Sequence, residues 1–193
     1  SEVAYQYMAG LMKYVPEITA FLNQNVNSYK RLVPGFEAPV YICWDPQNRS
    51  NLIRKPEYEP GNEKATRLEL RSPDPAANPY LALAMMISAG TQGIVEKLPS
   101  PKPSELDVYH LRQEERDKKG IRSLPGSLEE ALELAKGSEL VRSVVGERFM
   151  DDFAKIKQKE ISSYNLDLSL HGQPSKDDPK LSRYELERLL PIL

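Results

Sequence analysis

The chain changes character at Asn78, and this change constrains its fold more than any other feature. Before Asn78, a helical pattern is followed by short runs rich in β-branched and aromatic residues, separated by turn signals such as Gly61–Asn62. After Asn78, apolar residues recur at helical spacing, and S-x-x-E sequences of the kind that begin helices appear twice. A few strands followed by several helices predict an α+β protein.

The first half predicts one helix and three strands. We expect a helix over residues 2–23, broken or kinked at Pro16. We expect strands over residues 40–44, 50–54 and 66–71, the last two forming an antiparallel hairpin around the Gly61–Asn62 turn.

The second half predicts helices. Asn78 is a suitable N-cap with a proline after it, and the helix that follows is apolar nearly all round, so we expect it to be buried. Residues 98–126 are Pro-rich and charged, which indicates a surface connection around a short helix. We expect further helices after Ser127 and Ser182. Residues 165–193 are interpreted as a C-terminal extension, with a polar connector over 165–180 and a last helix. One amphipathic helix should carry Phe149, Phe153, Ile156 and Tyr164 on one stripe.

Composition excludes several classes of protein. The 193 residues are 40% hydrophobic and 28% charged with a net charge of -2, so no broadly basic surface recruits nucleic acid or an anionic membrane. The longest apolar run, over residues 81–89, is too short to span a bilayer. Cys43 is the single cysteine and cannot form an internal disulfide, which fits a reducing compartment. We therefore expect a cytoplasmic protein without a nucleic-acid or membrane partner.

Candidate chemistry is concentrated in one arginine-rich region. Arginine forks grip carboxylate and phosphate groups by paired hydrogen bonds, so several forks meeting in one cleft would suit a nucleoside triphosphate together with a carboxylate substrate. Glu69 stands between two arginines in "TRLELR", and an ionised carboxylate beside a phosphate site is a natural Mg²⁺ or Mn²⁺ ligand. The arginines of this region are Arg31, Arg49, Arg54, Arg67 and Arg71.

Ordinary structural explanations compete with this interpretation. Arg-x-Glu-x-Arg also suits an exposed strand face with weak ion pairs across the sheet. The two histidines, His110 and His171, stand in surface-like segments, and Cys43 stands in an apolar run where it would simply pack. Glu37 follows a Pro-Gly turn, either as an ordinary loop acid or as an acid on a closing flap.

Four motifs, taken in order, resemble one known family. These are "NSYKRLVPGFEAP", "NRS…IR", "RLELRSPDPAANPYLALA" and "SLPGSLEEAL". Together they resemble glutamine synthetase, from about residue 7 to residue 164 and again in "SRYELERLL". The resemblance implies ATP-dependent ligation of ammonia to L-glutamate through a γ-glutamyl phosphate, with Mg²⁺ or Mn²⁺ as the metal.

The resemblance also implies roles for single residues. Arg31 and Arg71 would bind glutamate, and Glu37 would lie on the flap that closes over the site and help remove a proton from the ammonia-derived nitrogen. Glu69 would bind the metal. Tyr109 matches a place where some bacterial members are adenylylated, but the residues around it differ from the family's pattern, which favours an ordinary partly exposed tyrosine. The residues that would contact ATP or its phosphates are Arg49, Arg54, Lys64 and Arg67, with Arg49 also stabilising the transferred group.

The family's enzymes are much longer than this chain. We interpret residues 1–193 as the C-terminal part of the catalytic domain, without the N-terminal β-grasp domain and without most metal ligands. The resemblance implies double-ring homo-oligomers for the whole enzyme, and for the isolated chain we expect self-association and no synthetase activity. Two alternatives remain: a γ-glutamyl ligase of the same superfamily that uses another amine, and a non-catalytic assembly or regulatory module.

Overall fold

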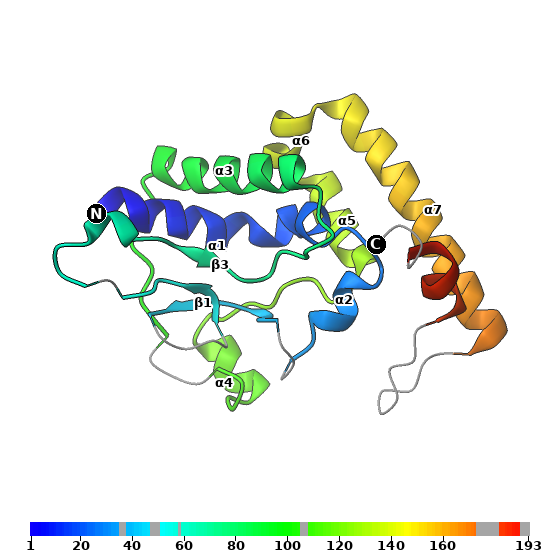
Figure 1. The fold of residues 1–193 in the computed structure, drawn as a ribbon, viewed down its shortest axis with the longest axis horizontal. Helices are drawn as coiled ribbons and strands as arrows, with labels where there is room; N and C mark the ends of the chain where they lie inside the picture. The colour runs from blue at the N-terminus through cyan, green and yellow to red at the C-terminus, as the bar shows by residue number, and fades with distance from the viewer. Residues whose placement is uncertain (35–37, 47–50, 58, 105–107, 173–181, 190–193) are drawn as a thin grey trace.

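The fold is α+β, as predicted, with a small sheet in the first half and helices around it (Figure 1). In this computed structural model, the described residues are 1–34, 38–46, 51–57, 59–104, 108–172 and 182–189. Among them, no helix combines the length and the apolar character that crossing a bilayer requires. The elements are α1 (Glu2–Leu22), α2 (Ser28–Arg31), β1 (Tyr41–Asp45), β2 (Asn51–Arg54), η1 (Glu63–Ala65), β3 (Glu69–Leu70), α3 (Pro79–Val95), α4 (Gln113–Lys118), α5 (Leu128–Gly137), α6 (Glu139–Val145), α7 (Glu147–His171) and η2 (Glu185–Leu189).

The sequence predicted a break or a kink at Pro16. Helix α1 continues through Pro16, so the break is wrong, and the kink stays a prediction. Proline has no N–H to donate to the carbonyl four residues earlier, and its ring crowds that carbonyl. The carbonyl concerned belongs to Met12, and it accepts a hydrogen bond from Nη2 of Arg122 at 3.0 Å. A distant guanidinium therefore replaces the hydrogen bond that Pro16 removes.

The sheet has the order β1-β2-β3. Strands β2 and β3 pair antiparallel, with Ile53 opposite Leu70 and Arg54 opposite Glu69, which confirms the predicted hairpin. The predicted strand around Val40–Trp44 is also present as β1, which pairs with β2 in parallel. The hairpin places Glu69 directly across from Arg54.

A segment of the predicted surface connection closes the free edge of β1. The backbone N–H of Ile42 donates to the carbonyl of Arg122, and that of Leu124 donates to the carbonyl of Val40, both at 2.8 Å. Helix α4 is the short helix expected in this connection. Residues 122–124 therefore act as a further partner of the sheet, which the sequence did not predict.

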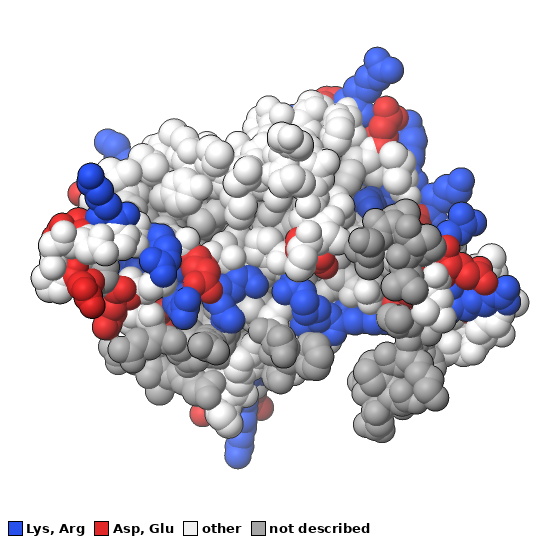
Figure 2. Space-filling model, in the orientation of Figure 1, with Lys and Arg blue, Asp and Glu red and all other residues white. Residues whose placement is uncertain are grey.

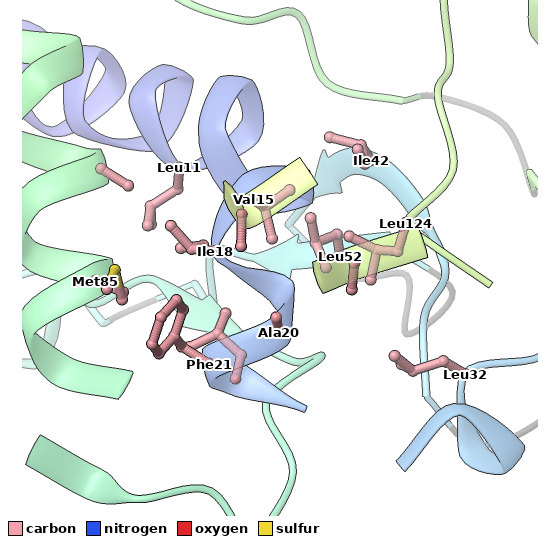
Figure 3. Packing of buried hydrophobic residues seen from close by; sticks show 14 of the residues in the cluster. Leu11, Val15, Ile18, Ala20, Phe21, Leu32, Ile42, Leu52, Met85 and Leu124 are labelled. Atoms are coloured by element: carbon pink, nitrogen blue, oxygen red, sulfur yellow. The ribbon is translucent and has the colours of Figure 1, made fainter. Parts of the chain in front are cut away.

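The core lies around α1, which runs between α3 and the sheet (Figure 1). Figure 3 shows side chains of α1, α3 and β2 meeting there, among them Ile18, Met85 and Leu52, which are fully buried. Helices α1 and α3 approach each other through glycines, and a Cβ added at Gly93 would lie 2.3 Å from the carbonyl oxygen of Gln6. This contact has no room for a side chain.

Helix α3 begins as predicted but is not buried on all sides. The Asn78 side chain accepts hydrogen bonds from the N–H groups of Tyr80 and Leu81, and Pro79 occupies the first turn. The expectation of complete burial is wrong, because the helix buries only the face that packs on α1 and its surroundings. The buried residues are Ala82, Met85, Ala89, Gly90 and Gly93.

Helix α7 differs from its prediction in its length and in the residues that it buries. It continues to His171, through residues for which the sequence predicted a polar connector. Phe153 of the predicted stripe is buried, but Phe149 and Ile156 are exposed. The residues that the helix buries are Met150, Phe153, Lys157 and Ile161.

The C-terminal segment, residues 182–189, attaches to both α7 and α2. Ser182 and Glu185 form the predicted capping box, each side chain accepting from the other residue's N–H. The buried Glu185 carboxylate also accepts a hydrogen bond from Nζ of Lys30 at 2.5 Å. The ring of Tyr184 packs against Tyr164 of α7. The segment therefore contacts the short helix that carries Arg31.

Candidate functional site

Glu69 is held between two arginines on one face of the β2–β3 pair. Its Oε2 accepts hydrogen bonds from Nε and Nη2 of Arg54, at 3.1 and 2.6 Å, in a two-pronged arrangement. Its Oε1 lies 3.1 Å from Nε of Arg71. All three side chains are partly exposed, with exposed fractions between 18 and 36%, so the cluster is open to a ligand.

Arg31 is fixed beside this cluster by two acceptors. Its Nη2 donates to Oδ1 of Asn23 at 3.1 Å and to the carbonyl of Ser72 at 2.5 Å. Asn23 stands at the end of α1, and Ser72 directly follows Arg71. The two contacts of Arg31 therefore link α2 both to the end of α1 and to the chain just after β3, next to Arg71, the other residue predicted to bind glutamate. The structure thus brings Arg54, Glu69 and Arg71 into direct contact, and it holds Arg31 against the residue that follows Arg71.

The surroundings of Arg31 are rich in hydrogen-bond donors. Its Nε, Nδ2 of Asn23 and Oγ of Ser72 are buried and have no hydrogen-bond partner among the described residues. Each of these atoms can donate a hydrogen bond. An excess of donors around a guanidinium is the chemical character that recognition of a carboxylate requires.

Arg67 makes a different contact from the other arginines. Its Nη1 donates to the carbonyl of Ala65, and its exposed side chain lines a hollow of about 500 Å³ with Lys55 and Tyr5. The Lys55 ammonium lies 5.8 Å from the centre of the Tyr5 ring. Lys64, in η1, is exposed. The hollow therefore combines two cations with an aromatic face.

Two predicted catalytic residues, Glu37 and Arg49, lie outside the described residues. The roles assigned to them remain predictions. The cluster at Glu69 neither supports nor contradicts these roles.

The remaining singled-out residues have ordinary environments. The Tyr109 ring packs against Tyr41, with ring centres 5.6 Å apart. Cys43 is buried and donates to Oδ1 of Asn51, and burial raises the pKa of its thiol to about 12. His110 and His171 are exposed, as expected. Packing accounts for Cys43, and the modification of Tyr109 stays a prediction.

Glu69 does not form a metal site with the described residues alone. No group of three or more His, Cys, Asp or Glu side chains in the described ranges is arranged to hold a metal ion. Both carboxylate oxygens of Glu69 are engaged by arginines. Glu69 can therefore supply one ligand at most, and other ligands must come from elsewhere.

Sequence reasoning missed three residues that shape this region. Lys55 directly follows Arg54 and could have been included as a further cation of the same strand. Asn23 and Ser72 fix Arg31 through a side-chain amide and a backbone carbonyl. Neither contact has a local sequence signal, because the partners are 8 and 41 residues from Arg31.

Comparison with known proteins identifies the family. The family model described as the glutamine synthetase catalytic domain matches residues 1–171. The chain belongs to the glutamine synthetase family. Among similar curated proteins, the glutamine synthetase of Methanosarcina mazei is 49% identical over 164 residues, which is 85% of this chain and 36% of that protein. That of Thermotoga maritima is 44% identical over 82% of this chain and 36% of its own length. That of Pyrococcus abyssi is 45% identical over 97% of this chain and 42% of its own length.

The chain therefore spans well under half the length of these glutamine synthetases. The arginine cluster around Glu69 and the Arg31 contacts lie within the matched residues.

Proposed function

We propose that this chain forms one wall of the active site of a glutamine synthetase, which ligates ammonia to L-glutamate at the expense of ATP. The observation that carries the proposal is Glu69 gripped by Arg54 and Arg71, with Arg31 fixed to the residue that follows Arg71. Two guanidinium groups on one carboxylate, with a third held to the next residue of the chain, provide excess positive charge on a surface that a ligand can reach. An anionic substrate would find paired donors there.

Each residue of the cluster has a role in this proposal. Arg31 and Arg71 would bind the carboxylates of glutamate, while Arg54 would neutralise charge on the transferred phosphoryl group. Glu69 would supply one oxygen ligand to Mg²⁺ or Mn²⁺, and carboxylates outside this chain would supply others. When bound, the metal would neutralise phosphate charge. Arg67 and Lys55, in the hollow beside Tyr5, would contact the nucleotide.

The proposal extends to residues and properties that the described part does not include. Glu37 would shield the γ-glutamyl phosphate and take a proton from the incoming nitrogen, and Arg49 would stabilise the transferred group. Residues 1–193 would be the C-terminal part of a catalytic domain in a cytoplasmic homo-oligomer.

The test uses a whole enzyme, the Methanosarcina mazei glutamine synthetase with its matching segment replaced by this chain. We expect this hybrid to release ADP in a reaction that depends on glutamate and ammonia. Glu69→Gln should lower kcat by roughly 10²-fold, because the metal that neutralises phosphate charge would lose a carboxylate ligand. Arg71→Lys should raise KM for glutamate about 10-fold, since lysine keeps the charge but loses the fork. The chain alone should release no ADP.

A matched control separates this role from simple surface pairing. Glu133 forms an exposed ion pair with Lys136 on α5, the kind of contact that contributes little. Glu133→Gln should leave activity within about twofold of the unmodified enzyme. If Glu69→Gln behaves like Glu133→Gln, Glu69 is only a surface ion-pair partner and the proposal is wrong.

A further inference from the structure

Helix α3 presents an outer face that is unlike the surface of an ordinary amphipathic helix. The helix contains no charged residue over Pro79–Val95, yet one side of it is open to solvent. A helix at a protein surface normally places charged and polar residues on its solvent side. We define the outer face of α3 by its exposed apolar residues, which are Tyr80 (83% exposed), Leu83 (53%), Ile87 (57%) and Val95 (68%).

The outer face is continuous rather than a set of scattered residues. Tyr80, Leu83 and Ile87 follow each other at spacings of three and four, and Val95 comes two turns later, so all four share one side of the helix. Figure 2 shows that the surface over α3 is almost free of Lys, Arg, Asp and Glu, while charges gather lower on the same face of the molecule. Contiguous apolar surface of this kind indicates a contact with another protein surface.

We infer that the outer face of α3 is covered in the working enzyme by the part of the same polypeptide that lies outside this chain. The matched relatives are more than twice as long as the segment they share with this chain, so an occupant of sufficient size exists. This inference rests on membership of the family and not on the proposed activity.

The absence of charge on α3 favours a permanent cover over a transient partner, and the length of the relatives outside the matched segment assigns that cover to the same polypeptide. Transient interfaces carry a polar rim, whereas permanent ones, obligate homodimers included, resemble a domain core cut in half. Helix α3 has no charged residue along its full length. A surface that is always covered does not need charged residues to keep it soluble. The small residues Ala84, Ser88 and Thr91, next to this face, would allow close approach of that cover.

The test measures thiol accessibility at Ile87. Cys43 is buried and its pKa is raised to about 12, so it will not react near neutral pH and an introduced thiol reports alone. In the isolated chain, Ile87→Cys should react with a thiol reagent at nearly the same rate as Lys155→Cys, an exposed position on α7. In the whole Methanosarcina mazei hybrid described above, Ile87→Cys should react at least about 10-fold more slowly, while Lys155→Cys should keep its rate.

Three outcomes would overturn the inference. Equal rates for Ile87→Cys in the isolated chain and in the folded hybrid would show that nothing covers the face. Protection that appears in the isolated chain and rises with its concentration would assign the face to a second copy. Protection of both Ile87→Cys and Lys155→Cys in the hybrid would indicate aggregation instead of a specific cover.

A second measurement needs no engineered protein and no activity. Hydroxyl-radical footprinting of the natural Methanosarcina mazei enzyme can be read at the residues that align with Tyr80, Leu83 and Ile87. Low modification there, against high modification of the same positions in the isolated chain, is expected. High modification in both would contradict the inference even if the enzyme is fully active.

Discussion

Gly93→Ala tests the close approach of α1 and α3, the two helices that meet in the core of the protein. A Cβ at this position would lie 2.3 Å from the carbonyl oxygen of Gln6 and 2.5 Å from Cα of Gly10. Both atoms belong to the backbone of α1, so no side chain can rotate away. The helices must move apart by roughly 1 Å to reach an ordinary contact near 3.5 Å.

The expected magnitude follows from two opposing terms. Overpacking of a rigid contact destabilises by about 1–3 kcal/mol, and a contact between two backbones belongs near the upper end. Alanine has a higher helix propensity than glycine by about 1 kcal/mol, which offsets part of this loss. We therefore expect Gly93→Ala to lower the free energy of unfolding by about 2 kcal/mol, which corresponds to a fall in Tm of about 4–8 °C for a chain of this size.

The assay is urea unfolding of the isolated chain, followed by circular dichroism, with a matched control. Gly137 ends α5 and an added Cβ there meets nothing within 4 Å, so Gly137→Ala should not destabilise. Gly10→Ala, whose Cβ would lie 2.3 Å from the carbonyl of Ala89, should resemble Gly93→Ala. In the double variant the two losses should be less than additive, because the first substitution already separates the helices. Equal stability of Gly93→Ala and Gly137→Ala would refute the reasoning.

Two further predictions concern the hydrogen bonds of Arg122 and of Glu96. Arg122→Ala should lower the free energy of unfolding by about 1 kcal/mol in urea titrations, because the carbonyl of Met12 loses its donor. The loss should shrink when Pro16→Ala restores a helical N–H, and an unchanged loss would show that Arg122 acts otherwise. Hydrogen bonds from Lys13, Tyr14 and Gln92 lower the pKa of Glu96 to about 2. The contribution of Glu96 to stability is therefore present above pH 4.5 and is lost as the pH falls through about 2. The difference in Tm between the unmodified chain and Glu96→Gln should therefore be constant from pH 7 to 5 and close towards pH 2, and a difference that does not depend on pH would contradict this linkage.

The strands were predictable because their signals are local. A β-rich run before "DPQN" and the two arms around Gly61–Asn62 each contain their own turn residues. The additional edge formed by residues 122–124 was not predictable, since its partner lies some 80 residues earlier. Pairing over such a distance depends on the assembled core rather than on the segment itself.

The helices show the same division between local and tertiary information. The N-caps at Asn78 and Ser127 were predicted and are present, because a cap depends on the next three residues. The predicted buried stripe of α7 was right for Phe153 but wrong for Phe149 and Ile156, which are exposed. Phe149 and Met150 are both apolar, so spacing alone permits either to face the core, and the packing of α7 on α5 and α6 decides in favour of Met150.

The resemblance named candidate site residues but not their contacts. It pointed to Arg31, Arg54, Glu69 and Arg71. In the structure, Arg54 and Arg71 contact Glu69, and Arg31 is bonded to the residue that follows Arg71. Nothing in the sequence indicated that Asn23 and the carbonyl of Ser72 fix the Arg31 fork. Arg67 was grouped with the cluster because of its spacing, but its side chain lines a separate hollow.

The three residues that close the sheet also couple it mechanically to the first helix. Their backbone is hydrogen-bonded to Val40 and Ile42, while the guanidinium of Arg122 is bonded to the carbonyls beside Pro16. Peeling this short strip from the edge of β1 would therefore also expose the weakest turn of α1. The strip, the edge strand and the middle of α1 should open as one cooperative unit in native-state exchange, although they come from three distant parts of the chain.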